Sequence, residues 1–346
     1  MIQVNTAKFS LILIVIGAVI MAFAHWVHVD YLFFASYTIL QFIVLATAWN
    51  ILGGYCGYVN FGSAAFFAMG AYSSVALYKF DPQSFEFCFT DSTCMSFHFL
   101  DWAFPIPIPV LIIIGGLVSG IAGFGMGYLT LRLRGSFFAI ATLALAVVLQ
   151  TLVVNWNYVG GSRGAYVIRP NEIAVLGSYV QYLFLIMLGL TVVSLTVARA
   201  IEHSWLGYGF STIRDDELAA EASGVPTLKL KLIATAVSGA IMGMAGAPFP
   251  YYIGYLEPSS AFGLPYAVNS IAMPMIGGTT TWVGPLIGAL LLGTLQQVAT
   301  VTISSAVNLL LVGLLLVGFV IIAPNGIVGL VQPWLRRSKG KKPHGG

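Results

Sequence analysis

The chain alternates between long apolar stretches and short polar connections. A helix crosses a bilayer with about 20 consecutive apolar residues, or with fewer where the helix is broken. Stretches that meet this requirement lie at Phe9–Ala24, Phe33–Leu52, Asn60–Tyr78, Pro107–Tyr128, Ser136–Trp156, Tyr179–Ala198, Leu232–Tyr252, Gly263–Ile276, Pro285–Thr302 and Val307–Ala323. The pattern predicts an all-α polytopic membrane protein with about ten transmembrane helices, some of them broken.

Two of these stretches depart from the simple pattern. Phe9–Ala24 ends in Ala22-Phe23-Ala24 and resembles a signal peptide with its cleavage site, but further spans follow at once. We interpret it as an uncleaved first span. Gly263–Ile276 is short and contains Pro265 and Pro274, which predicts a broken or re-entrant helix.

Composition supports a membrane protein. Of the 346 residues, 58% are hydrophobic and only 8% are charged, and the mean hydropathy is +0.91. A soluble domain carries about a quarter of its residues as charges. The net charge of +3 does not indicate nucleic-acid binding, because the few Lys and Arg residues lie near the ends of apolar stretches.

Basic residues fall mainly on one side of the ten-span arrangement, which should be the cytoplasm, with both termini inside. That side holds Lys8, Arg132, Arg134, Arg199, Arg214, Lys229, Lys231 and the segment Arg336–Lys342. The opposite side holds Asp81, Glu86, Asp91, Asp101 and Glu257, with Lys79, Arg163 and Arg169 as exceptions. We predict a transmembrane domain over 1–335, with a periplasmic loop at 79–106 and a cytoplasmic loop at 202–231, and a basic cytoplasmic tail at 336–346.

The cysteines allow two interpretations. Cys88 and Cys94 share the predicted periplasmic loop, where an oxidising compartment would permit a disulfide between them. Two free thiols are an equal alternative, since sequence spacing does not show geometry. Cys56 lies among apolar residues and is expected to be a small packing residue.

Glycines interrupt the apolar pattern at Gly53–Gly57 and again at Gly277–Pro285. Unwound backbone at membrane depth is tolerated only against protein or a water-filled cavity, and in transporters it often lines the path. A tight turn between two spans is the alternative, and we favour it for Gly277–Pro285. Small residues spaced by four predict close helix contacts at Gly116/Gly120, Gly123/Gly127 and Gly239/Gly243.

The predicted spans contain no Asp, Glu, Lys, Arg or His. Ion-coupled transporters and proton pumps usually need such groups inside the membrane. The chain also lacks a G-x-x-x-x-G-K-[ST] phosphate loop, and its five His residues show no metal-ligand spacing. An intramembrane enzyme is disfavoured, because a catalytic dyad would need His in a span. What remains is a pore or pathway with no metal site or cofactor of its own.

The segment Ser211–Lys231 is the most densely charged of the connections between the apolar stretches. Its middle predicts a short helix, capped by Thr212 or Asp215 and ended by Gly224-Val225-Pro226. An alanine-faced helix at a membrane surface is a shape that a partner protein can hold, and an ordinary solvated loop is the alternative.

Within this segment, Ala219-Ala220, three free positions and Gly224 resemble the cytoplasmic coupling loop of ABC importer permeases. The usual glutamate before the alanines is replaced by Leu218, with Glu217 one place earlier, as in the branched-chain amino acid type. Four further stretches resemble the M permease subunit of that branch: Trp49–Tyr72, Leu131–Leu145, Met275–Gly293 and Pro324–Leu330.

The resemblance implies a complex in the bacterial inner membrane. This chain would pair with a second permease, two cytoplasmic ATPases that bind ATP and magnesium, and a periplasmic solute-binding protein. The residues implied in coupling to the ATPases are Arg214, Asp215, Glu217, Ala219, Ala220, Glu221 and Gly224. The solute would be a branched-chain or similar amino acid, and the same architecture would also suit urea, short amides or small carboxylates.

Polar residues within apolar spans are candidates for the solute pathway, since a small polar solute needs hydrogen-bond partners there. They are Asn50, Asn60, Ser63, Thr142, Gln150 and Asn269. For each, an interhelical hydrogen bond is the competing and favoured interpretation. A stand-alone facilitator or channel is the alternative of another class, and it would leave the charged segment without a purpose.

Overall fold

The computed structural model describes residues 17, 30–79, 86–88, 94–96, 107–130, 133, 135–168, 178–302, 305–323 and 326–330. The described residues leave out the predicted first span Phe9–Ala24 apart from Gly17, the basic residues Lys8, Arg132 and Arg134, most of loop 79–106 and the tail 336–346. The α-helices are α2 (Asp30–Asn50), α3 (Ser63–Tyr78), α4 (Ile108–Thr130), α5 (Ser136–Val154), α6 (Tyr179–Glu202), α7 (Trp205–Asp215), α8 (Glu217–Ala222), α9 (Thr227–Gly246), α10 (Phe249–Ile253), α11 (Pro258–Ala261), α12 (Leu264–Gly277), α13 (Val283–Thr302) and α14 (Ser305–Ile322).

The predicted all-α class is confirmed. Each predicted span from Phe33 onward overlaps a helix, and Leu232–Tyr252 covers parts of two, α9 and α10. Among the described residues, six helical segments are long and apolar enough to cross a membrane. They are Tyr31–Tyr55, Ile108–Thr130, Ser136–Val154, Tyr179–Glu202, Thr227–Ile253 and Val283–Thr302. Helix α12 is shorter, with 14 residues, and continues unbroken through Pro274, so the predicted break is absent; a re-entrant position stays a prediction.

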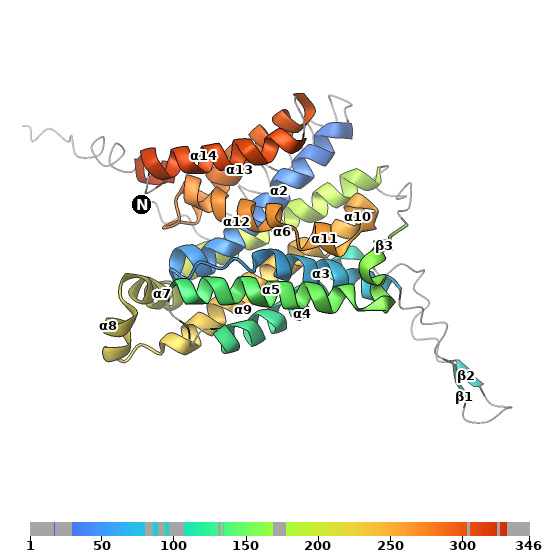
Figure 1. Ribbon diagram of the computed structural model, residues 1–346, viewed down its shortest axis with the longest axis horizontal. Coiled ribbons are helices and arrows are strands. Elements are labelled where there is room, and N and C mark those ends of the chain that lie inside the picture. The colour runs from blue at the N-terminus through green and yellow to red at the C-terminus, as the bar shows by residue number, and fades with distance from the viewer. Residues whose placement is uncertain are drawn as a thin grey trace, which may run out of the picture.

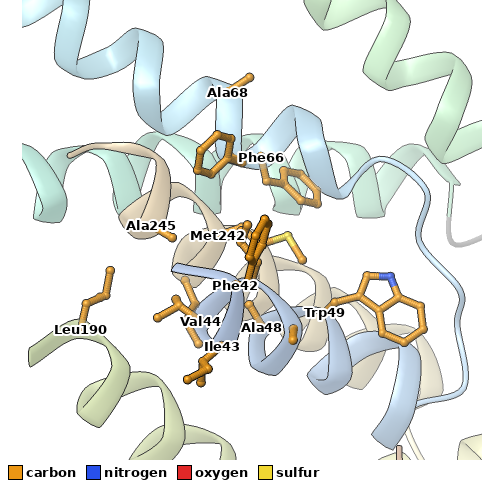
Figure 2. Close-up of a cluster of buried hydrophobic side chains, with 14 of the residues drawn as sticks. Phe42, Ile43, Val44, Ala48, Trp49, Phe66, Ala68, Leu190, Met242 and Ala245 are labelled. Carbon is orange, nitrogen blue, oxygen red and sulfur yellow. The ribbon is translucent and has the colours of Figure 1, made fainter. Parts of the chain in front are cut away.

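Helix α2 lies at the centre of the bundle, in contact with α6, α9, α12 and α13. Figure 2 shows its side chains Phe42, Ile43 and Val44 between Phe66 of α3 and Leu190 of α6. Helices α7 and α8 lie at one end of the molecule and strand β3 (Ala165–Tyr166) at the other (Figure 1). We call these the α8 end and the β3 end. At the latter, β3 pairs antiparallel with β4 (Tyr255–Leu256).

Glycines hold α3, α4 and α9 together, as the spacing of small residues predicted. A Cβ atom at Gly243 of α9 would collide with Ser119 of α4, and one at Gly70 of α3 would collide with the backbone of Gly243. At Gly239, a Cβ atom would lie only 3.0 Å from the carbonyl oxygen of Ser119. Lipid provides no hydrophobic drive for helix association, so this close backbone contact supplies much of the packing energy.

Both predicted glycine interruptions are present. Helix α2 passes into a π-helix, η1 (Ile51–Tyr55), and then into an irregular stretch before α3 begins. The indole Nε1 of Trp49 donates a hydrogen bond of 2.9 Å to the carbonyl of Asn60 and so closes this stretch back onto α2. The second interruption, between Gly277 and Val283, is the tight turn that we favoured, and it joins α12 to α13.

The short strands β1 (Glu86–Cys88) and β2 (Cys94–Ser96) pair antiparallel, with the backbone of Cys88 opposite that of Cys94. Directly opposed residues in an antiparallel ladder have Cα atoms about 4.5–5.5 Å apart, within the range that a disulfide spans. The side chains of this hairpin lie outside the described residues, and the disulfide stays a prediction. Cys56 is fully buried, which confirms it as a packing residue.

Candidate functional site: a tethered surface helix and an uncharged cavity

The charged segment forms two helices joined by the single extended residue Asp216. Its carboxylate accepts a hydrogen bond of 3.0 Å from the backbone N–H of Ala219 and so caps α8. The sequence predicted Thr212 or Asp215 as the cap, and this was wrong: both residues belong to α7. The cap lies where the backbone leaves the helical region before α8, and that occurs at Asp216.

The predicted end of the short helix is confirmed. Helix α8 stops at Ala222, and Gly224 adopts φ +80°, a left-handed conformation that favours glycine. A Cβ atom at Gly224 would meet nothing within 4 Å, so the constraint there is backbone conformation and not space. The carboxylate of Glu221 accepts a hydrogen bond of 2.9 Å from Thr227, which fixes the turn into α9.

Glu217 and Lys231 form a buried ion pair, with 2.6 Å between Nζ and Oε1. The side chains are 13% and 3% exposed respectively. The burial of this pair argues against the alternative interpretation of the segment as an ordinary solvated loop. Because α9 begins immediately after the turn at Pro226, its first turns bring Lys231 back beneath α8.

Tyr58 completes this cluster. Its hydroxyl donates to Oε2 of Glu217, and Nζ of Lys231 donates to the same hydroxyl at 3.3 Å. Nζ also lies 4.7 Å from the centre of the Tyr58 ring, in cation–π contact. Since Tyr58 belongs to the irregular stretch after η1, the cluster ties α8 directly to the first glycine interruption.

Further contacts strengthen this connection. The guanidinium of Arg214 at the end of α7 donates to the carbonyl of Gly54 in η1 at 3.3 Å. A Cβ atom at Gly57 would come within 2.9 Å of the Arg214 side chain, and Gly57 has φ +80°. Glycine is required at Gly57 on both grounds, and η1 lies between α7 and the core of the bundle.

Glu202, at the end of α6, links the two glycine interruptions. Its Oε2 accepts hydrogen bonds from the hydroxyl of Tyr55 at 3.2 Å and from the backbone N–H of Trp282 at 2.7 Å. The guanidinium of Arg199 lies 5.8 Å from the centre of the Trp282 ring. The sequence analysis did not single out Glu202, because it falls just outside the apolar run. We call Tyr55, Tyr58, Glu202, Arg214, Glu217, Lys231 and Trp282 the junction.

The second interruption is held by backbone contact. Cβ atoms at Gly277, Gly284 and Gly288 would collide with the backbone of the facing segment. Thr281 in this turn places its carbonyl oxygen 3.5 Å from Nδ2 of Asn50.

A cavity of about 470 Å³ opens beside the junction, bounded by Tyr58, Phe61, Ser136, Ile213 and Glu217.

Most of the predicted pathway residues make hydrogen bonds within the bundle. The side chain of Asn60 accepts from the N–H of Gly62 at 2.7 Å, Thr142 accepts from the N–H of Phe61 at 3.2 Å, and Ser63 lies 2.8 Å from the hydroxyl of Ser270. These three residues, like Asn50, are buried. Gln150 is half-buried on α5, one of the outer helices of the bundle. Their role in transport stays a prediction.

Asn269 has a different environment. It lines a cavity of about 410 Å³ that lies between α2, α11, α12 and α13, toward the β3 end. Its Oδ1 accepts a hydrogen bond of 2.8 Å from Nε2 of Gln296 on α13, and both residues are almost fully buried. Thr38, Ser260 and Tyr266 also line this cavity. Sequence analysis missed Gln296 and Thr38, although both are polar residues within predicted spans.

Within the described part of the chain, no cluster of three or more His, Cys, Asp or Glu residues could hold a metal ion. Apolar helices with their charged groups gathered at the ends define a polytopic membrane protein. The family model for the permease component of branched-chain amino acid transport systems matches residues 31–320, and the chain belongs to that family.

Individual relatives agree with this assignment. The high-affinity branched-chain amino acid transport system permease protein LivM of Salmonella typhimurium is 25% identical, over 97% of this chain and 79% of the relative. LivM of Escherichia coli is 26% identical over the same shares. The ribose import permease protein RbsC of Haemophilus influenzae is 26% identical over 55% of this chain and 59% of the relative. No solved structure matches the chain significantly.

Proposed function

We propose that the chain is the permease subunit of an ATP-driven importer in the bacterial inner membrane. It passes branched-chain amino acids or similar small solutes after delivery by a periplasmic binding protein. The observation that carries the proposal is the tethering of α8 to the first glycine interruption through Glu217, Lys231 and Tyr58. A surface helix tied in this way transmits a displacement to the membrane-spanning helices instead of absorbing it.

The working complex contains a second permease subunit and two cytoplasmic ATPases, which bind ATP and magnesium. Helix α8 suits contact with an ATPase, because its inward side is fixed by Ala220 and Glu217 while Leu218 is 62% exposed. The α8 end is then cytoplasmic, and Arg199, Arg214 and Lys231, which gather there, accord with the rule that positive residues lie inside.

The nearest alternatives concern the solute. RbsC is named for ribose and the relative LsrC of Yersinia pseudotuberculosis for autoinducer 2, so related permeases are named for chemically different cargo. Urea, short amides and small carboxylates are the remaining candidates. A facilitator that works without ATPases is disfavoured, because it would give no role to the tethered helix.

Co-purification tests the composition of the complex. The chain is extracted in mild detergent from its native membrane, and the proteins that accompany it are identified by mass spectrometry. We expect two ATPases and a second permease. If the chain is recovered alone and still passes leucine into liposomes without ATP, the importer proposal is wrong.

The Gly224→Glu substitution tests coupling. The added side chain has open space, so the protein is expected to fold, while the new charge disrupts the surface that an ATPase would contact. In the reconstituted complex, ATP hydrolysis should continue while leucine uptake is lost. Gly224→Ala is the matched control: it imposes the same backbone strain, about 1–2 kcal/mol, without the charge. Reversing the charges of Asp215 and Glu221 together should uncouple ATP hydrolysis from leucine uptake in the same way. Normal uptake in these variants would contradict the role of α8.

A further inference from the structure

The cavity toward the β3 end contains two buried amide side chains that do not satisfy each other completely. Asn269 is 8% exposed and Gln296 is 5% exposed, and a single hydrogen bond of 2.8 Å joins them. Among the described residues, nothing accepts from Nδ2 of Asn269 or donates to Oε1 of Gln296. The NH₂ group of Asn269 and the carbonyl oxygen of Gln296 are therefore left at the wall of a cavity of about 410 Å³. A pocket of a few hundred Å³ is the size that holds a small molecule.

The cavity wall is polar but carries no charge. None of the described residues that line it is Asp, Glu, Lys, Arg or His. A solute with a net charge would leave its hydration shell here without gaining a counter-ion, which is costly. A solute without net charge would exchange water for the amide and hydroxyl groups of the wall. The cavity therefore discriminates by net charge.

The segment that forms α11 and the start of α12 carries groups of opposite polarity. Gly263 and Pro265 at the N-terminus of α12 line the cavity, and the positive end of a helix dipole favours a carboxylate. In the same segment, Ser259 donates a hydrogen bond of 2.6 Å to the carboxylate of Glu257, which lies outside the cavity lining. Apolar surface comes from Phe42 and the ring of Tyr266. This arrangement complements a zwitterion with an apolar side chain.

We propose that this cavity is a transit site within the permease, in which Asn269 and Gln296 bind a zwitterionic solute with an apolar side chain and which excludes solutes of net charge. The inference rests on the proposed function and sharpens it, because it separates apolar amino acids from small carboxylates. Part of the discrimination between solutes then takes place in the membrane subunit itself.

Transport by the reconstituted complex gives the first test. Asn269→Leu and Gln296→Leu remove the amides at similar size, and we expect ATP-dependent leucine uptake to fall at least about tenfold, since each loses a solute hydrogen bond in a water-poor site. ATP hydrolysis should stay within about twofold, because the junction is untouched. Thr294→Val, on the outward face of α13, is the matched control and should transport normally. If the wild-type complex fails to transport leucine, the proposed function fails, and the second test still decides the cavity.

The second test measures protection of a cysteine in the full complex. Cys88 and Cys94 are replaced by serine, while Cys56 can stay because burial raises the pKa of its thiol to about 12. The variants are Ser260→Cys, on the cavity wall, and Ser162→Cys, exposed at the same end but outside the cavity. L-leucine should slow maleimide labelling of the Ser260→Cys variant at least about threefold, as expected at twice its dissociation constant.

Butyrate, which has a carboxylate but no ammonium group, should leave the labelling rate unchanged, and neither compound should affect the Ser162→Cys variant. The proposal is wrong if leucine does not protect the Ser260→Cys variant, if leucine slows labelling of both variants equally, or if butyrate protects as well as leucine does.

Discussion

The two ends of this permease place polar groups in the membrane domain in opposite ways. At the α8 end they are ionised and paired: Lys231 lies against Glu217, and Glu202 accepts from Tyr55 and Trp282. At the β3 end the cavity is lined by amides and hydroxyls that carry no charge. Both ends have a cavity, but the one at the α8 end lies beside ionised groups and the one at the β3 end is lined by neutral groups.

The difference has a physical basis. A buried charge that loses its partner is strongly destabilising, so an ion pair fixes the relative position of the segments that carry it. An amide can exchange its partner for a solute atom at a cost of about 1 kcal/mol. Ions therefore suit a junction that must move as a unit, and amides suit a site that must fill and empty.

The largest expected effect comes from Lys231→Met. It leaves the carboxylate of Glu217 buried without its counter-ion, and the loss of stability should be about 3–5 kcal/mol. Thermal unfolding of the purified chain in mild detergent measures this, as a large fall in melting temperature or a failure to recover folded protein.

A double variant shows whether the cost arises from the unpaired charge. Glu217→Gln with Lys231→Met removes both charges and should recover most of the stability, because replacing a buried pair by neutral groups is often close to neutral. ATP-dependent uptake should stay impaired, since the tether between α8 and Tyr58 is weakened. A double variant as unstable as the single one would show that the pair is not the source.

The next effect is expected at the second glycine interruption. In Gly277→Ala the new methyl group would collide with the carbonyl of Gly284, so α12 and α13 must separate, at a cost of about 1–3 kcal/mol. Gly224→Ala, where the space is open and only φ is strained, should cost less. Melting temperatures compare the two, and an equal loss would mean that backbone conformation and not helix contact governs Gly277.

A smaller effect is expected for Gln296→Leu. Hydrogen bonds between membrane helices average about 0.6 kcal/mol, so the melting temperature should hardly change even though leucine uptake falls. A loss of stability as large as that of Lys231→Met would mean that the amide pair stabilises the fold as the ion pair does. The two ends would then not differ in this respect.

The smallest effect is expected for Asp215→Asn. The Asp215 side chain is 76% exposed and its contact with Arg214 is 3.6 Å, and exposed ion pairs are worth about 0–1 kcal/mol. Melting temperature should be unchanged within error. A measurable fall in melting temperature would show that exposed charges on this segment also stabilise the fold, as the buried pair does.

Hydropathy predicted the helices well, because length and apolar content are local properties of the chain. The end of α8 was also predictable, since Gly224-Val225-Pro226 is a local stop signal. The close contacts at Gly239 and Gly243 followed from the spacing of small residues. In each case the information lies within a few residues of the feature.

Pairings across the fold were not predictable. Glu217 and Lys231 appear in the sequence as two more charges of a polar loop, and only the turn at Pro226 brings them together. Tyr58 lies far from both in the sequence. Asn60 and Thr142 were candidates for the pathway because they are polar and apolar residues surround them, yet the structure shows each bonded to neighbouring backbone. A polar residue within a span indicates that its side chain has a hydrogen-bond partner. The sequence does not show whether that partner is the solute or another part of the protein.

The glycine contact between α4 and α9 also has a consequence for biosynthesis. Ser119 and Gly243 pack together although roughly 120 residues separate them, so at about 5–20 residues per second the ribosome finishes α4 roughly 6–25 s before α9 emerges. During that time the glycine face of α4 has α3 beside it but lacks its second partner, α9. Part of that face is therefore exposed to lipid or to the insertion machinery until α9 enters the membrane and completes the contact.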